Sequence, residues 1–292
     1  MPSELLQRRL IFVTGKGGVG KSTVASALGM AASQQGLRTI VADLTGEGDA
    51  EETEIAPNLY RLSVDPQSAM EEYLTLKVGG AAGQLLSQSR LFGALAMATP
   101  GMRELLSLGK VWELSQPRRR TPDAEPYDLT IVDAPASGHG VALLRTPSTF
   151  AEIAKVGPIA SQASAIDQTL KDPQVTAYVA VAVPEELAVS ETLELDEALE
   201  QMQLRFDTVV LNAVHPDRFD DADRATLASL PAHPSAPQVA LSLAADARAL
   251  TELTQRDLLC ERFGERLRTL PFLFTAQLGQ AELQLLAQEL AE

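Results

Sequence analysis

A glycine-rich segment at residues 15–23, with the sequence GKGGVGKST, constrains the fold of this chain more than any other feature. It follows a short apolar run at residues 10–13 and precedes a run of small, mostly apolar residues at 24–32. A strand that passes through such a loop into a helix is typical of a phosphate-binding loop, where backbone N–H groups converge on one anionic centre. The sequence therefore predicts a nucleoside triphosphate site formed by Gly15, Lys16, Gly17, Gly18, Val19, Gly20, Lys21, Ser22 and Thr23.

The two lysines of this segment have different expected roles. We expect Lys21 to contact the β- and γ-phosphates, while the hydroxyl of Ser22 coordinates Mg²⁺. Lys16 lies so early in the loop that it points away from these phosphates and can reach the nucleotide of a neighbouring protomer. The segment resembles the deviant Walker-A family of dimeric ATPases, and this resemblance implies that Lys16 acts across a dimer interface.

The alternation of short apolar runs with longer helical patterns predicts the fold class. Most of the apolar runs lack a polar face, which is typical of strands that helices cover on both sides. We therefore expect an α/β fold, with a mainly parallel β-sheet flanked by helices, in a single P-loop ATPase domain over residues 1–292. The expected strands lie at residues 10–14, 38–43, 59–64, 128–133, 176–183, 208–212 and 268–272.

The strand pattern stops over residues 65–120, which predicts an inserted helical subdomain within this domain. Helical patterns occur there at residues 70–76, 83–97 and 102–114. The apolar side chains of these patterns form a stripe, and such a stripe is typical of a helical core. The segment also holds three of the chain's six methionines, Met70, Met97 and Met102. Flexible thioethers suit a groove for varied apolar partners, so core and groove both stay open as interpretations.

Asp133 closes the apolar run at residues 129–132, where a Walker-B carboxylate can hold a Mg²⁺-bound water opposite Ser22. The segment DAPASGH at residues 133–139 resembles switch II of the arsenite-pump and tail-anchored-protein-targeting ATPases, although its proline falls one residue earlier. The segments at residues 99–104 and 184–192 resemble further parts of the same family. The resemblance thus extends over nearly the whole chain.

The same resemblance implies an adenine site late in the chain. Asn212 ends a run that matches the strand whose asparagine reads the base, and an amide offers both a donor and an acceptor for that contact. Pro271 lies in a segment that matches one packing on the base. The alternatives are a turn at Asn212 and no nucleotide role for Pro271. His139 either couples the phosphate state to conformation or is a surface histidine without a ligand.

One departure from the family pattern concerns hydrolysis. The acid that positions the attacking water in this family falls at Thr45 here, and threonine cannot take up the proton of the water at neutral pH. Asp43 matches the first acid of an Asp-x-Asp variant of this segment, while Glu47 and Asp49 are nearby acids. The sequence therefore predicts slow hydrolysis, unless one of these acids takes the catalytic position.

Charge and cysteine content exclude several classes of partner. A formal net charge of −15 disfavours nucleic acid and anionic membrane surfaces, and we expect the basic run at residues 118–120 to be a solvated loop. The single cysteine, Cys260, cannot form an intramolecular disulfide, a Cys-x-x-Cys zinc site or a three-sulfur metalloid site, so no zinc is expected. No apolar run approaches the length of a membrane helix. We expect a cytoplasmic protein without a direct membrane anchor.

The resemblance implies an ATPase or ATP switch that uses ATP and Mg²⁺. It would couple ATP binding and hydrolysis to closure of a dimer and to binding of an apolar helical client. The dimer would be a homodimer or a heterodimer with a related ATPase. The alternatives are a regulatory protomer that does not hydrolyse ATP, an energising subunit of an arsenite or other anion pump, a DNA- or membrane-positioning protein, and an ATP-dependent synthase.

Overall fold

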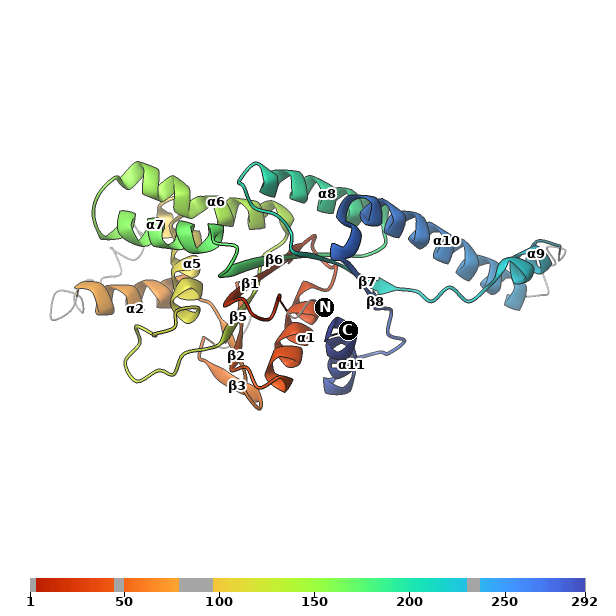
Figure 1. Cartoon of the computed structure of the whole chain (residues 1–292), viewed down its shortest axis with the longest axis horizontal. Coiled ribbons are helices and arrows are strands. Elements are labelled where there is room, and N and C mark those ends of the chain that lie inside the picture. The colour runs from red at the N-terminus through yellow and green to blue at the C-terminus, as the bar shows by residue number, and fades with distance from the viewer. Residues whose placement is uncertain (1–3, 45–49, 79–96, 230–236, 292) are drawn as a thin grey trace.

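A computed structural model describes residues 4–44, 50–78, 97–229 and 237–291 of the chain. In these residues eight strands form one sheet, in the order β3-β4-β2-β5-β1-β6-β7-β8 (Figure 1). The strands are β1 Leu10–Gly15, β2 Thr39–Asp43, β3 Thr53–Ala56, β4 Leu59–Ser63, β5 Leu129–Asp133, β6 Thr176–Ala182, β7 Thr208–Val214 and β8 Leu267–Pro271. Neighbouring strands are parallel except β3 and β4, which are antiparallel. The predicted α/β fold is confirmed.

All the predicted strands occur, with ends that differ from the expected ends by at most two residues. The edge strand β3 was not predicted. Its residues are largely exposed, so the four-residue segment has neither a buried apolar run nor a clear alternation. A short exposed edge strand is held by its pairing with β4, and this pairing leaves little trace in the local sequence.

Helices cover both faces of the sheet. The helices are α1 Lys21–Gln34, α2 Pro66–Val78, α5 Met102–Leu114, α6 Ser137–Ala154, α7 Pro158–Lys171, α8 Glu186–Glu200, α9 Asp221–Ser229, α10 Pro237–Phe263 and α11 Gln280–Ala291. On one face, α1 and α11 pack on a buried cluster that includes Ile11 and Val13 of β1. On the other face, α5 to α8 and the end of α10 pack on a cluster that includes Leu10 and Phe12. Successive side chains of β1 thus point to opposite faces of the sheet and pack into two separate hydrophobic cores.

The helical end of the molecule combines two parts of the chain. The predicted helices at residues 70–76 and 102–114 are confirmed as α2 and α5, whereas residues 79–96 lie outside the described residues. There α5 packs against α2 and also against α6 and α7, which come later in the chain. The indole N–H of Trp112 on α5 donates a hydrogen bond to Thr169 on α7 at 3.0 Å, and the Arg120 guanidinium lies 4.3 Å from the Trp112 ring centroid.

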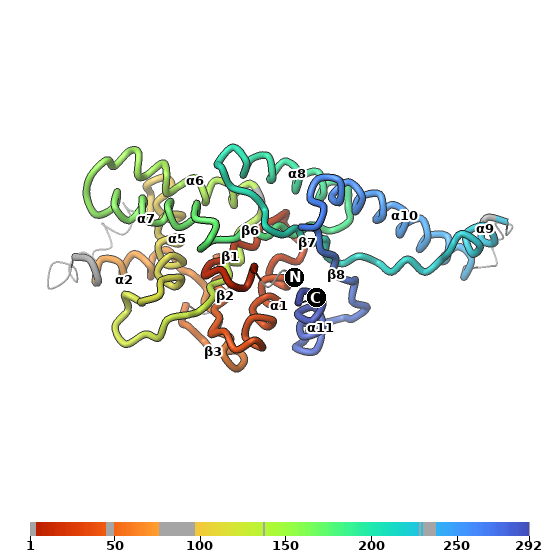
Figure 2. The backbone as a smooth tube through the Cα atoms, in the orientation of Figure 1, coloured from red at the N-terminus to blue at the C-terminus, as the bar shows by residue number. Residues whose placement is uncertain are grey.

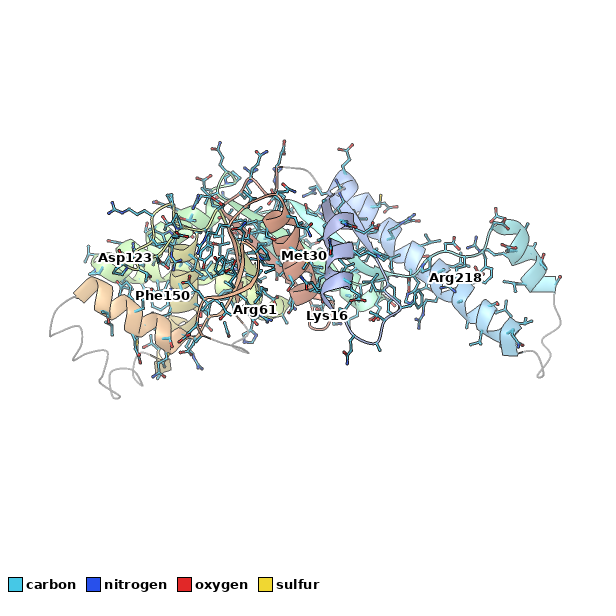
Figure 3. The ribbon with its side chains drawn as sticks, turned by 90° about the horizontal axis from the view of Figure 1, so that it is seen from below. Lys16, Met30, Arg61, Asp123, Phe150 and Arg218 are labelled. Atoms are coloured by element: carbon cyan, nitrogen blue, oxygen red, sulfur yellow. The ribbon has the colours of Figure 1, made fainter. Side chains whose placement is uncertain are left out.

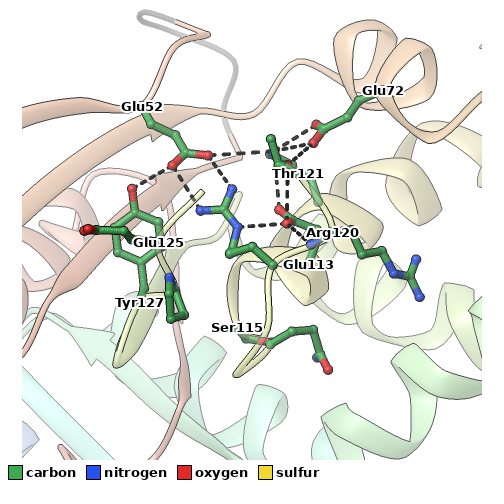
Figure 4. A network of polar contacts seen from close by, with 12 residues as sticks. Glu52, Glu72, Glu113, Ser115, Arg120, Thr121, Glu125 and Tyr127 are labelled. Atoms are coloured by element: carbon green, nitrogen blue, oxygen red, sulfur yellow. Dashed lines mark hydrogen bonds and ion pairs between the residues drawn. The ribbon is translucent and has the colours of Figure 1, made fainter. Parts of the chain in front are cut away.

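The basic run at residues 118–120 lies in a loop, as predicted, and Arg118 is exposed, but the prediction that the run is solvated was wrong for Arg119, which is buried. The Arg119 side chain is only 1% exposed and donates to Glu113 at 2.8 Å and to Glu52 at 2.6 Å (Figure 4). Lys110, which bonds Glu72 at 2.8 Å, approaches Glu113 within 3.5 Å. The carboxylates that pair with Arg119 belong to Glu52, which is far away in the sequence, and to Glu113 on α5. The sequence around Arg119 does not reveal this pairing.

At the opposite end, α9 and α10 extend away from the sheet as an arm (Figures 1 and 2). The arm exposes Leu241, whose accessibility is 70%, while Leu259 and Phe263 at the other end of α10 are buried in the core. Within the described part of the chain, no helix is long and apolar enough to cross a membrane.

Candidate nucleotide site

The site lies where the sheet changes the face on which its connecting helices pack. The carboxyl ends of β1, β2, β5 and β6 meet at one edge, with Val13 and Asp43 both in register with Asp133. The chain leaves β1 for α1 on one face and leaves β5 for α6 on the other. In open parallel sheets, ligands bind in the crevice at such a switch point.

The glycine loop at residues 15–20 joins β1 to α1 and lies tightly against the neighbouring strands. Gly15 and Gly20 have positive φ values of 148° and 91°. A Cβ atom on Gly15 would collide with the carbonyl group of Val181, and one on Gly20 would collide with the Asn212 side chain. These positions therefore need glycine for both conformation and space. The backbone is shaped as a phosphate-binding loop requires, with α1 beginning at Lys21.

Lys21 is held over this loop. Its ammonium donates a hydrogen bond to the carbonyl oxygen of Lys16 at 2.8 Å. Burial lowers the pKa of Lys21 below its usual range, and the nearby charge of Asp133 partly opposes this shift. A partly buried cation at the amino end of a helix, next to a ring of backbone N–H groups, is suited to anionic phosphates.

Asp133 and Asp43 end neighbouring strands as register partners, and they are only 3% and 4% exposed. Burial raises the pKa of Asp133, a hydrogen bond with Ser22 opposes this shift, and the charge of Asp43 adds to it. Oxygen Oδ1 of Asp133 has no hydrogen-bond partner among the described residues. A buried carboxylate oxygen that lacks a partner, beside a serine hydroxyl and a second carboxylate, fits a hard cation such as Mg²⁺.

Arg61 is a site residue that the sequence analysis missed. One guanidinium nitrogen lies 3.4 Å from Asp43 Oδ2, and the Arg61 side chain is 52% exposed. In β4, Ser63 is the register partner of Asp43, so Arg61 two residues earlier lies on the same face of the sheet. The available signal was a charged residue inside an otherwise apolar predicted strand. Its meaning depends on β4 lying beside β2, which the sequence alone does not give.

The structure brings Lys16 to α8 instead of to its own phosphate loop. Its ammonium lies 3.2 Å from Oε1 of Glu191, and the two side chains are 28% and 30% exposed. Figure 3 labels Lys16 on the loop after β1 and Arg61 on β4. Glu191 belongs to the segment 184–192 that the resemblance identified, but no role was predicted for it.

Asn212 reaches the phosphate loop from β7. Its amide nitrogen donates to the carbonyl oxygen of Val19 at 2.9 Å. Pro271 ends the adjacent strand β8, in register with Val214. The two predicted adenine residues therefore lie on neighbouring strands, and Asn212 also contacts the loop.

A histidine and two aromatic residues lie beyond this pair. The Nδ1 atom and the backbone N–H of His215 are each 2.8 Å from the Glu252 carboxylate. Its ring stacks on Phe272 with a centroid distance of 4.3 Å, and Phe274 packs edge-on. His139 is exposed in the first turn of α6.

Thr45, Glu47 and Asp49 lie outside the described residues, so the predicted substitution of the catalytic acid is not placed in space. Of the acids considered for hydrolysis, Asp43 is therefore the one whose position is described. In the described ranges, no group of three or more His, Cys, Asp and Glu side chains is arranged to hold a metal ion. A Mg²⁺ ion at Ser22 and Asp133 would need phosphate and water oxygens for its remaining ligands.

The strand β1, the glycine loop and the helix α1 follow one another at the switch point of a parallel sheet, and a buried aspartate ends the neighbouring strand β5. This arrangement defines a P-loop nucleotide-binding protein. The model of the family described as anion-transporting ATPase matches residues 8–157 and 151–229. The chain belongs to this family of P-loop ATPases, to which the arsenite-pump and GET3 ATPases are related. The resemblance noted in the sequence is confirmed.

Curated relatives of two kinds match most of the chain. The ATPase BagA of Mycobacterium tuberculosis and the putative ATPase Mb3704 of Mycobacterium bovis are each 33% identical over 249 residues, covering 78% of this chain and 71% of the relative. The ATPase GET3 of Kluyveromyces lactis is 26% identical over 261 residues, covering 74% of each protein. These matches support ATPase activity and use of a nucleotide in general.

Proposed function

We propose that this protein is an ATP-driven switch in which two protomers close around ATP and bind an apolar helical client. The observation that carries the proposal is a mainly apolar cavity at the helical end of a P-loop ATPase, together with the exposed apolar side chains of Ile153 and Val156. The resemblance to the tail-anchored-protein-targeting ATPases supports the same function. The protein would act as a homodimer or as a heterodimer with a related ATPase.

In this proposal the phosphate loop, residues 15–23, binds the phosphates through its backbone N–H groups. Lys21 moves its hydrogen bond from the Lys16 carbonyl to the phosphates. Asn212 and Pro271 would contact the adenine, for which their places near the carboxyl end of β7 and at the end of β8 are suitable. Because Asn212 already bonds the loop through Val19, base recognition and loop conformation would be linked.

Oxygen Oδ1 of Asp133, which has no hydrogen-bond partner among the described residues, and the nearby Ser22 hydroxyl fit a Mg²⁺ ion. Ser22 would be a direct ligand, and Asp133 would act through a water. Bound Mg²⁺ would neutralise part of the phosphate charge. Asp133 would accept a hydrogen bond from that water and, as the last residue of β5, connects the site to the segment that enters α6. Arg61 holds the neighbouring carboxylate of Asp43 in place.

Hydrolysis by the isolated protein would be slow in this proposal. Thr45 stands where the family has an acid, and Asp43, the nearest described acid, is engaged by Arg61. A protomer that binds Mg-ATP and hydrolyses it slowly also fits a regulatory role beside an active relative. In both roles, as a slow ATPase or as a regulatory protomer, the binding of ATP is the signal that closes the dimer.

The client would bind at the helical end, formed by the inserted subdomain at residues 65–120 together with α6 and α7. A cavity of about 140 Å³ lies between α2, α5 and α7. The exposed surface of its walls is mainly apolar and comes from Met70, Tyr73, Leu74, Met102, Leu105 and Leu106, while Glu72, Lys110, Glu113, Arg120 and Gln162 line its polar side. Ile159 on α7 also lines the cavity, and Ile153 at the end of α6 and Val156 in the turn before α7 are 76% and 85% exposed. Apolar side chains that line a cavity and others that are exposed at the turn before the same helix, α7, are suited to an amphipathic or apolar helix.

The binding of a labelled apolar helical peptide tests this assignment. Fluorescence anisotropy would be measured with Mg²⁺ and a non-hydrolysable ATP analogue, and again with ADP. We expect Val156→Asp to weaken peptide binding about tenfold or more, because a charge replaces an apolar contact worth ~1.5–3 kcal/mol. Leu241→Asp is the matched control, since Leu241 is similarly exposed on the distant arm. Equal affinities of both variants and the wild type, or no peptide binding in either nucleotide state, would refute the client surface.

A further inference from the structure

The ion pair between Lys16 and Glu191 joins the phosphate loop to α8 within one protomer. The two charged atoms are 3.2 Å apart, and each side chain is about seven-tenths buried, with exposures of 28% and 30%. The strands behind them are parallel neighbours, with Gly15 of β1 in register with Val181 of β6. The loop after β1 therefore lies next to the segment that leads from β6 into α8.

The backbone fixes where Lys16 begins. The backbone of Gly15 lies directly against the Val181 carbonyl group of β6, because a Cβ atom at Gly15 would collide with that group. Glu191 lies in the second turn of α8, whose first residue is Glu186. The start of the loop and the second turn of α8 thus present one cation and one carboxylate to each other.

We propose that Glu191 is a positioning residue that holds Lys16 within its own protomer until the phosphates of a partner's nucleotide compete for it. This inference rests on the proposed ATP-closed dimer and names a contact that weakens when the dimer closes. The two acceptors of Lys16, a carboxylate in the same protomer and phosphate oxygens in the other, belong to different states of the assembly. Glu191 therefore raises the nucleotide concentration at which the dimer forms.

The strength of the pair suits this role. Partly exposed ion pairs contribute little to stability, so this contact can break without disturbing the fold. The apparent affinity of a state that needs free Lys16 is reduced by the fraction of protomers in which Lys16 is free. For an exposed pair this reduction is about two- to fivefold in each protomer.

Sedimentation velocity over a titration with a non-hydrolysable ATP analogue and Mg²⁺ tests the proposal. We expect Glu191→Gln, which keeps the shape but removes the charge, to lower the midpoint of dimerisation about two- to fivefold or more. Glu194→Gln is the matched control, because Glu194 is exposed three residues further along α8 and has no ion pair in the described part of the chain. Its midpoint should equal that of the wild type. Thermal unfolding of the monomer should be unchanged in both variants.

The double variant separates positioning from a structural role. Lys16→Ala should itself weaken dimerisation, and adding Glu191→Gln in that background should neither restore dimerisation nor change it further, because the contact that it removes is already absent. An unchanged or raised midpoint in Glu191→Gln, or the same shift with and without Lys16, would overturn the inference while leaving the ATP-closed dimer in place. A wild type that stays monomeric at saturating analogue would overturn the dimer and this inference together.

Discussion

Single side chains around the phosphate loop already differ in what they bind. Lys21 donates to a backbone carbonyl of its own loop, whereas Lys16 pairs with a carboxylate on α8. Both lysines come from one nine-residue motif, yet only one of them lies over the loop. Substitutions at the two positions should therefore affect different properties of the protein.

Lys21→Ala should weaken ATP binding strongly without changing the fold. Loss of a charge-assisted phosphate contact costs ~1.5–3 kcal/mol, or about ten- to more than a hundredfold in affinity. Calorimetry with Mg-ATP measures the effect. Lys16→Ala serves as the control, with nearly wild-type affinity in the monomer. Wild-type affinity in Lys21→Ala would mean that the loop is not the phosphate site.

Thr45→Asp should raise the rate of hydrolysis. A positioned acid or base typically contributes ~10²–10⁴-fold, and threonine cannot fill that role. Single-turnover hydrolysis compares the wild type, Thr45→Asp and Asp43→Asn. A fast wild type that Asp43→Asn inactivates would instead assign the catalytic position to Asp43.

At the scale of elements, a charge network around the buried Arg119 joins the segment before β3 to α5 and the loop after it. Arg119, after α5, bonds both carboxylate oxygens of Glu52, which precedes β3, and Tyr127 donates to the same carboxylate at 2.7 Å. Glu113 on α5 accepts from the other side of the Arg119 guanidinium. The network therefore ties the edge of the sheet to the helical end.

Arg119→Ala should destabilise the protein much more than Arg118→Ala. Removing one partner of a buried ion pair leaves uncompensated charges and costs ~3–5 kcal/mol, whereas an exposed substitution changes stability by about 0.5 kcal/mol or less. Arg118 is exposed and adjacent, so it is a matched control. Urea unfolding measures both variants. Equal midpoints would show that the network does not stabilise the fold.

The same network predicts a dependence of stability on pH. Burial is the largest single influence and would raise the pKa of Glu113 and Glu52, but the hydrogen bonds and the positive charges of Arg119 and Lys110 around them together outweigh burial and lower both pKa values below the ordinary 4.5. Their contribution to stability is present above the unfolded pKa and is lost as pH falls through the folded values. The difference in unfolding free energy between wild type and Arg119→Ala should therefore shrink as pH falls below about 4.5. A difference that stays constant down to pH 3 would contradict this account.

The buried strands could be predicted because each is an apolar run with its own turn signals. The phosphate loop and Asp133 could be predicted because their spacing is local. The partners of Arg119 and Arg61 could not, since they depend on which strands become neighbours. The packing of α5 against α6 and α7 was also missed, because the strand β5 separates them in the sequence.

At the scale of the whole molecule, the sheet separates two helical extensions. The end formed by α2, α5, α6 and α7 and the arm formed by α9 and α10 lie on opposite sides of the nucleotide site (Figure 2). If ATP controls the client surface, the two extensions should respond to the nucleotide differently.

Hydrogen exchange should detect this difference. We expect amides in α2, α5 and the turn between α6 and α7 to exchange at different rates in the ATP-analogue and ADP forms, because local opening follows the packing of each element. Amides in the distal part of α10 provide an internal control with equal rates. Identical exchange at the helical end in both forms would favour a plain structural core there.

The hydrogen bond between Trp112 and Thr169 has a practical consequence. Trp112 is the only tryptophan of the chain, so intrinsic indole emission comes from one point, at the junction of α5 and α7. The wavelength and the intensity of that emission depend on the hydrogen bond to Thr169 and on the Arg120 guanidinium over the ring. The unlabelled protein thus carries an optical probe of its helical end.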